Sequence, residues 1–195
     1  MLNRRGLNAG IAVSLAGASW PVKGWAQSAL SFYASLGPNL ILYDLDVTAA
    51  SLSRRTRVSL PANLQYAWPH PSRHFLYVVA SNGQPPSGPT GAAGADKNHY
   101  AIAFKAGADG RLTEHGPRKL LPVRPIHCST DVTGNYLLVA FNIPSMIRVF
   151  RLNADGTIGD EVAQDSSLDF GIYAHQVRGT PSGRTVTLCS RGNDA

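Results

Sequence analysis

Hydrophobic and polar positions alternate along most of this chain, in short runs separated by turns rich in glycine, proline and asparagine. The clearest unit is residues 124–142, where a short strand, a turn centred on Gly134 and a second strand rich in β-branched and aromatic residues follow one another. The same order occurs at residues 64–82 and at residues 175–190. After the first 26 residues no convincing long amphipathic helix appears. The pattern therefore predicts an all-β protein.

Further strands are expected before and between these units. They are predicted at residues 30–36, 39–47, 56–60, 98–105 and 146–152. The first three would be later strands of one unit, and the charged side chains of residues 56–60 suit an edge strand. Two Asp-Gly hairpins, with Gly110 and Gly156 46 residues apart, stand at equivalent points of their units. Repeats of roughly 40 to 50 residues with about four short strands predict a β-propeller, here with roughly three and a half four-stranded blades.

Residues 1–26 resemble an export signal rather than part of the fold. A charged start with two adjacent arginines precedes an apolar run at residues 10–18, and small residues follow at Gly24 and Ala26. The arginine pair is similar to the twin-arginine motif, and the apolar run is too short to span a bilayer. We therefore expect a signal peptide, a periplasmic protein and a propeller domain at residues 27–195. The alternative is an ordinary cytoplasmic N-terminus.

Composition and charge argue against several classes of partner and site. The net charge of +6 includes three basic residues within positions 1–26, which leaves 15 scattered basic residues against 12 acidic ones. Nucleic-acid binding is therefore not indicated.

Cys128 and Cys189 stand in strands of different repeats, which favours two unpaired core thiols over a disulfide. Residues 82–97, rich in glycine, proline and alanine, predict a loop between two strands of one blade, either a surface insertion or a lid. We expect no metal and no cofactor, because the sequence has neither metal-ligand spacing nor a phosphate-binding loop.

The repeats also share a finer pattern: a His or Asp, a Pro or Val, a short turn, and then an aromatic-rich strand. Residues 70–77, 126–142 and 174–194 carry it. In this pattern the chain resembles the seven-bladed β-propeller lactonases, which include propeller-type 6-phosphogluconolactonases and the fungal carboxymuconate-lactonizing enzymes. The resemblance covers nearly all of residues 30–195 and implies the fold more firmly than the reaction. The chain departs from the family at Ser190, where the family tends to have an acidic residue.

The resemblance implies an active site at one mouth of the central channel. The family uses a histidine near the entry to an innermost strand, with arginines and a glutamate from later blades. His175 matches that histidine and stands eight residues before the turn glycine Gly183, whereas His127 stands seven before Gly134. Alternating side chains then place the two histidines on opposite sides of equivalent strands. His175 is the expected catalytic residue, His127 is not expected to take part, and no substrate-binding residue is assigned.

The implied function is hydrolysis of a sugar-acid lactone. Neutral His175 would activate water, and cationic groups would stabilise the oxyanion. A carboxymuconate cyclase-like lactonizing enzyme and a non-catalytic binding scaffold are the alternatives, with a small-molecule lactone as the expected partner of the enzyme. Export argues against phosphogluconolactone, because that sugar phosphate is cytoplasmic. The family's later arginines and glutamate would follow Ala195, so we expect this chain alone to be an inactive, incomplete ring that self-associates through open edges.

The remaining candidates receive structural roles. Trp68 and Phe141 are expected to pack between blades, and Arg178, three residues after His175, to face away from it. Four further histidines are expected to be surface or capping residues: His70, His74, His99 and His115.

Overall fold

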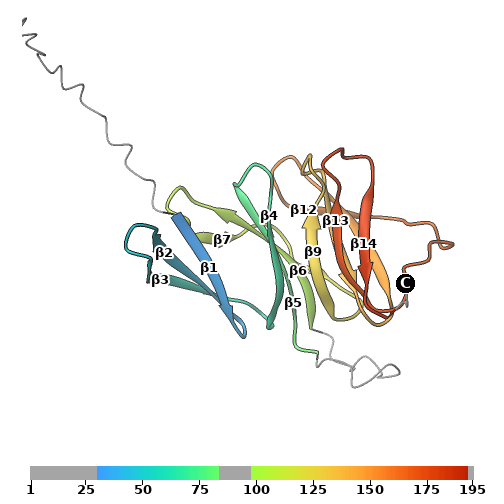
Figure 1. The fold of residues 1–195 in the computed structure, drawn as a ribbon, viewed down its shortest axis with the longest axis horizontal. Coiled ribbons are helices and arrows are strands. Elements are labelled where there is room, and N and C mark those ends of the chain that lie inside the picture. Colours follow the sequence, from blue (N-terminus) through green and yellow to red (C-terminus); the bar gives the residue numbers. More distant parts are fainter. Residues whose placement is uncertain (1–29, 84–97, 193–195) are drawn as a thin grey trace, which may run out of the picture.

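The computed structural model describes residues 30–83 and 98–192. The expected export signal and residues 84–97 of the expected loop lie outside this range. The described residues form only strands and their connections, which confirms the all-β prediction. They contain no helix that could cross a membrane. Four separate antiparallel sheets stand side by side in chain order, as successive propeller blades do (Figure 1).

The sheets follow the predicted repeats. The first contains β1 (Leu30–Leu36), β2 (Asn39–Asp46) and β3 (Ser51–Ser59). The second contains β4 (Leu64–Pro69), β5 (Phe75–Ser81), β6 (His99–Ala106) and β7 (Leu112–Glu114), with the short β8 (Lys119–Leu120) also paired to β6. The third contains β9 (Pro125–Thr130), β10 (Tyr136–Phe141), β11 (Met146–Leu152) and β12 (Ile158–Val162). The fourth contains β13 (Ala174–Gly179) and β14 (Val186–Ser190).

The bounds of β3 differ from the prediction, and the ends of β5 and β6 agree with it. The strand expected at residues 56–60 is the second half of β3, which begins at Ser51 because the segment pairs with β2 along its length, from Asp46↔Ser51 to Asn39↔Ser59. Ser81 and His99 are partners in the β5–β6 ladder. The expected loop at residues 82–97 therefore connects two neighbouring strands of one sheet, as predicted.

The first sheet consists of the later strands of a blade, as the sequence predicted. Tyr33 on β1 donates its hydroxyl hydrogen bond to the carbonyl of Gly110, in the β6–β7 turn of the second sheet. Tyr77 on β5 makes the same contact, 3.0 Å long, with the carbonyl of Gly156 in the β11–β12 turn of the third sheet. β1 thus occupies the place of β5, the second strand of its sheet. Among the described residues no strand pairs with the other edge of β1.

The hydrophobic core lies between the sheets, in three layers. Central strands are apolar on both faces, so that Leu76 and Val78 of β5 face the first sheet while Tyr77 and Val79 face the third. The three layers join successive pairs of sheets, and Val177 of β13 belongs to the last of them. Phe141 is fully buried in the second layer, which confirms its expected packing role.

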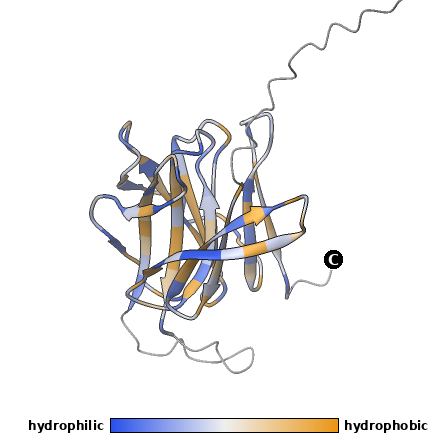
Figure 2. Cartoon of the chain, turned by 90° about the vertical axis from the view of Figure 1, so that its left-hand side faces the viewer, coloured by the Kyte–Doolittle hydropathy of each residue, from blue (hydrophilic) through white to orange (hydrophobic). Residues whose placement is uncertain are grey.

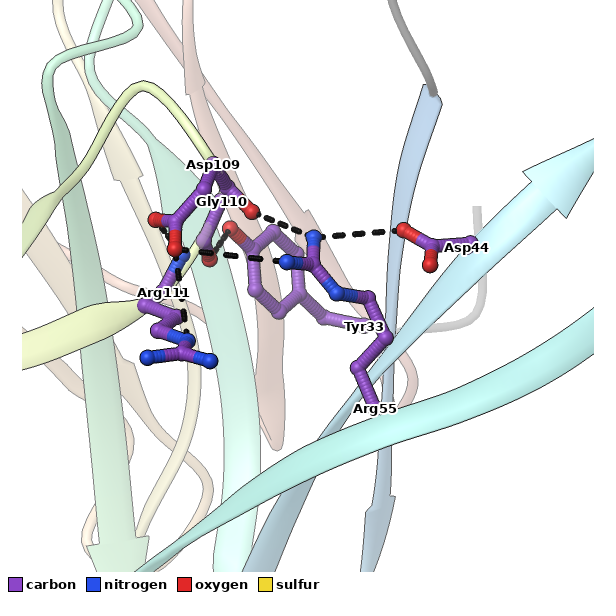
Figure 3. A network of polar contacts seen from close by, with 6 residues as sticks. All are labelled: Tyr33, Asp44, Arg55, Asp109, Gly110 and Arg111. Atoms are coloured by element: carbon purple, nitrogen blue, oxygen red, sulfur yellow. Dashed lines mark hydrogen bonds and ion pairs between the residues drawn. The ribbon is translucent and has the colours of Figure 1, made fainter.

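A polar network reinforces the junction of the first two sheets (Figure 3). The Arg55 guanidinium on β3 lies 3.2 Å from the Asp44 carboxylate and donates a 2.7 Å hydrogen bond to the carbonyl of Asp109. Arg111 lies 3.3 Å from the Asp109 carboxylate. These side chains are partly exposed, and such pairs individually contribute little to stability. Their effect is to orient the β6–β7 turn against β3.

The outer face of the first sheet is rich in exposed apolar side chains. Leu30, Phe32 and Leu36 of β1 are 49%, 43% and 73% exposed, and Leu52 of β3 is 49% exposed. Figure 2 views the molecule from this side and shows hydrophobic positions along these strands. The corresponding faces of the second and third sheets are covered by the sheet that precedes each of them. Exposed apolar faces of this kind are candidate contact surfaces.

Polar substitutions on this face are expected to reduce self-association. The double variant Phe32→Thr, Leu36→Lys should elute later from a size-exclusion column than the unchanged chain at the same concentration. Association would then remove less apolar surface from water, so its free energy is less favourable. Leu120→Lys is the matched control, since Leu120 is 68% exposed but lies on β8. Equal elution of the double variant and the unchanged chain would contradict this role.

Candidate active site

Three neighbouring strands carry the candidate residues. β4, β9 and β13 are the first strands of their sheets, and each packs beside the next. Each carries a β-bulge near its beginning, which leaves Gln65, Ile126 and His175 without a cross-strand partner. A bulge changes the direction of its side chain and is frequent beside active sites. His175 therefore occupies the bulged position, and this bulge recurs in the first strand of three successive sheets.

His175 is an exposed, uncharged base at this position. Partial burial and the positive charge of Arg191 lower its pKa below the usual value of 6.5. Arg191 follows β14 and is held near β13 by a 3.1 Å hydrogen bond from its backbone N–H to the carbonyl of Tyr173. At neutral pH the imidazole is therefore free to accept a proton.

His127 lies one register position away from the place of His175. It pairs with Ala140, as Gln176 pairs with Cys189, so Ile126 and not His127 is the structural equivalent of His175. His127 is only 3% exposed, whereas His175 is open to solvent. The predicted offset between the two histidines is thus confirmed. The catalytic role of His175 stays a prediction.

The surroundings of His127 keep its ring neutral. The ring of Tyr66 lies tilted against that of His127 at 4.1 Å between centroids, and the ring of Trp68 lies at 6.1 Å. The backbone N–H of Val177 donates a 3.4 Å hydrogen bond to Nδ1, and Nε2 has no hydrogen-bond partner among the described residues. Burial first, and then the positive charges of Arg178 and His175, lower the pKa of His127 to about 4.

Arg178 extends from β13 past β9 to the second sheet. Its guanidinium lies over the ring of Trp68 at 4.5 Å from the centroid, a cation–π contact. Trp68 also packs against the apolar layer between the second and third sheets, as expected, so it has two roles. Sequence reasoning missed the contact because it joins strands far apart in the chain. The bulge at His175 also interrupts the alternation on which the expectation for Arg178 rested.

Positive charge at these strands is not balanced by ion pairs. Arg178, Arg191 and Arg124, which precedes β9, form no salt bridge within residues 30–83 and 98–192. Burial lowers the pKa of Arg124, and its Nε has no hydrogen-bond partner in the same part of the chain. A site with free cationic donors suits an oxygen-rich or anionic ligand.

Two of the remaining histidines connect neighbouring sheets, and one is buried. Nε2 of His70 lies 3.1 Å from the carbonyl oxygen of Gly134, and Nε2 of His115 lies 2.8 Å from that of Asp155. The surface role expected for His99 is wrong, because this residue begins β6 inside the second sheet and its Nδ1 lies 2.8 Å from Ser81 Oγ. His74 is exposed, as expected. In the described part of the chain no three histidine, cysteine or acidic residues are grouped as metal ligands.

Both cysteines are free thiols, but only one is a core residue. Cys128 is fully buried against the second sheet, and burial raises its pKa. Cys189 is exposed, contrary to the expectation of two core thiols. It lies on β14, which is an edge strand of a two-stranded sheet and has one open face.

Comparisons with known proteins agree with the geometry. A family described as "Lactonase, 7-bladed beta-propeller" matches residues 31–195. A 6-phosphogluconolactonase of Cronobacter sakazakii is 31% identical over 130 residues, and one of Pectobacterium carotovorum is 26% identical over 129. Each alignment covers 66% of this chain and 33% of the relative, so the chain matches about a third of their length.

Solved structures show the same fold. The Pseudomonas aeruginosa periplasmic gluconolactonase PpgL superposes with a TM-score of 0.63 at 20% identity, covering 81% of this chain and 46% of that protein. A protein from Lactobacillus plantarum superposes with a TM-score of 0.62 at 14% identity, covering 85% of this chain and 48% of that protein. Both matches span less than half of the longer protein.

The buried, neutral state of His127 predicts a loss of stability in acid. Between pH 6.5 and about 4 the unfolded ring binds a proton that the folded ring does not, so the free energy of unfolding falls as the pH falls. The two pKa values, 6.5 and about 4, correspond to at most about 3 kcal/mol at pH 4. His127→Gln, which does not titrate, should flatten this part of the curve in urea unfolding at several pH values. An unchanged slope would contradict the burial argument.

Proposed function

The chain belongs to the seven-bladed β-propeller lactonase family, and we propose that it carries the general base of a site that hydrolyses a sugar-acid lactone. The observation that supports this most is His175 itself, an exposed imidazole with a lowered pKa on a β-bulge of an innermost strand. The curated relatives are 6-phosphogluconolactonases. The resemblance of the repeats to the family implies a catalytic histidine at this position.

The reaction needs only groups of the kinds that β13 and the residues beside it present. Neutral His175 takes a proton from water, and the hydroxide attacks the lactone carbonyl carbon. The tetrahedral intermediate carries its negative charge on the former carbonyl oxygen, where a cationic donor such as Arg178 or Arg191 stabilises it. The bond from this carbon to the ring oxygen then breaks, and the ring oxygen receives the proton from His175. The product is an open sugar acid.

Further blades complete the site in this proposal. The family has seven blades, and the described residues form four sheets, of which the first and the fourth lack strands that the second and third possess. An additional blade would pack on the exposed outer face of the first sheet, and further strands of the fourth sheet would pair with the free edge of β14. These blades come either from further residues of the same polypeptide or from a second copy.

The proposed location is the periplasm, and the proposed substrate is accordingly an unphosphorylated lactone. The order of charged, apolar and small residues in positions 1–26 supports export.

This location predicts cleavage near Gln27. N-terminal sequencing of protein from the periplasmic fraction should give a chain that begins there. A retained Met1 would contradict export.

His175→Ala is expected to lower lactone hydrolysis at least about a hundredfold, the usual scale for loss of a general base. The protein should be purified from cells that make it, so that any further blades or second copies are retained. Hydrolysis of gluconolactone and of its 6-phosphate is then followed from pH 5 to 8. The rate should fall in acid with a midpoint below pH 6.5, because only the neutral imidazole accepts the proton and its pKa is lowered.

The control is Arg184→Ala, since Arg184 is an exposed turn residue after β13 and should leave the rate unchanged. Activity that survives His175→Ala would remove this residue from the mechanism. Binding of either lactone without hydrolysis in the unchanged protein would favour the binding scaffold instead.

A further inference from the structure

Both polar backbone groups of Val177 are bound by side chains of the neighbouring sheet. Its N–H donates to His127 Nδ1 at 3.4 Å, and its carbonyl accepts a 2.7 Å hydrogen bond from Ser129 Oγ. Val177 is fully buried two residues after His175, on the edge of β13 that does not pair with β14. Buried backbone groups at a strand edge are costly unless they find partners. β9 supplies both partners.

This arrangement requires one protonation state of His127. Nδ1 must carry a lone pair to accept from Val177, so the proton of the neutral ring lies on Nε2. Tyr66 and Trp68 pack against the ring from β4, while Arg178 and His175 act on it electrostatically from β13. The positive charge of Arg178, and in acid that of protonated His175, oppose protonation of His127, which would remove the acceptor. The surroundings therefore maintain the form that binds Val177.

The two contacts are particular to the junction that carries His175. In the register of the second sheet, Tyr66 and Trp68 hold the positions that His127 and Ser129 hold in the third. Those two residues meet β9 through their rings. At this earlier junction the bulged residue of β9 is Ile126, which has no titratable group. The polar pair of His127 and Ser129 is thus found on the strand that precedes β13, whose bulge holds the base His175.

We propose that His127 and Ser129 are positioning residues that hold β13 through Val177 and so fix the bulge that carries His175. The catalytic importance of this position rests on the proposed function, but the mechanical coupling does not. His127 acts through the backbone and does not exchange a proton with substrate. This gives a role to the histidine for which the sequence predicted none. It also explains why a neutral ring is buried at this junction.

The test measures β13 directly in the full chain. In His127→Phe the ring shape is kept but the acceptor is lost, and in Ser129→Ala only the donor is lost. Hydrogen exchange of the Val177 amide should become roughly tenfold faster in His127→Phe, the scale for losing one buried hydrogen bond. In an NMR titration of both variants the pKa of His175 should return toward 6.5. Ser129→Thr keeps the hydroxyl and should restore the unchanged behaviour.

A matched control separates positioning from general loosening. Ser81→Ala removes a buried serine that contacts a histidine ring within the second sheet, away from β13. It should lower stability without altering the His175 titration. Unchanged Val177 exchange and an unchanged His175 titration in His127→Phe and Ser129→Ala would overturn the proposal. An equal change in Ser81→Ala would also overturn it.

Activity gives an independent readout. In protein that hydrolyses a lactone, Ser129→Ala should lower kcat roughly tenfold to a hundredfold with little change in KM, because a displaced base affects the reacting geometry more than binding. A response of His175 in the NMR titration without hydrolysis in the unchanged protein would count against the proposed function and leave the coupling intact. Loss of kcat without a response of His175 would overturn the positioning role.

Discussion

Burial of each sheet against the next is the interaction on which the rest of this structure depends. Every central strand is apolar on both faces, and neither face is stable in water unless a neighbouring sheet covers it. This explains why the turns, the polar network at Arg55 and the candidate site are all found at junctions between sheets. It also explains the exposed apolar face of β1 and β3, where the described residues supply no cover.

Polar contacts between sheets add specificity to this burial. The hydroxyl groups of Tyr33 and Tyr77 donate to turn carbonyls of the next sheet, and His70 and His115 contact such carbonyls through a ring nitrogen. The turns fit closely, since a Cβ atom on Gly156 would lie 2.4 Å from the Phe75 ring and this glycine has a positive φ of 87°. Only glycine meets both conditions. The hydrophobic layers hold the sheets together, and these contacts fix their relative register.

Much of the fold could be predicted from the sequence because its signals are local. Alternation and Asp-Gly turns fixed the strands of the second and third sheets, and the one-residue offset between His127 and His175 followed from counting to the turn glycines. The contacts that define the site are not local. The bulge beside His175, the Arg178–Trp68 contact and the bonds to Val177 join strands of different sheets. Nothing in a short window of sequence encodes them, and the burial of His99 was missed for the same reason.

The direction of the contacts between sheets has a consequence for how the chain assembles. In three of these contacts the side chain that donates precedes the backbone carbonyl that accepts: Tyr33 comes before Gly110, Tyr77 before Gly156, and Ser129 before Val177. A chain that emerges from the ribosome N-terminus first therefore presents these three donor side chains before their acceptors have been made. Each finished sheet can serve as the surface on which the following one folds. Vectorial synthesis and the architecture of the junctions thus run in the same direction.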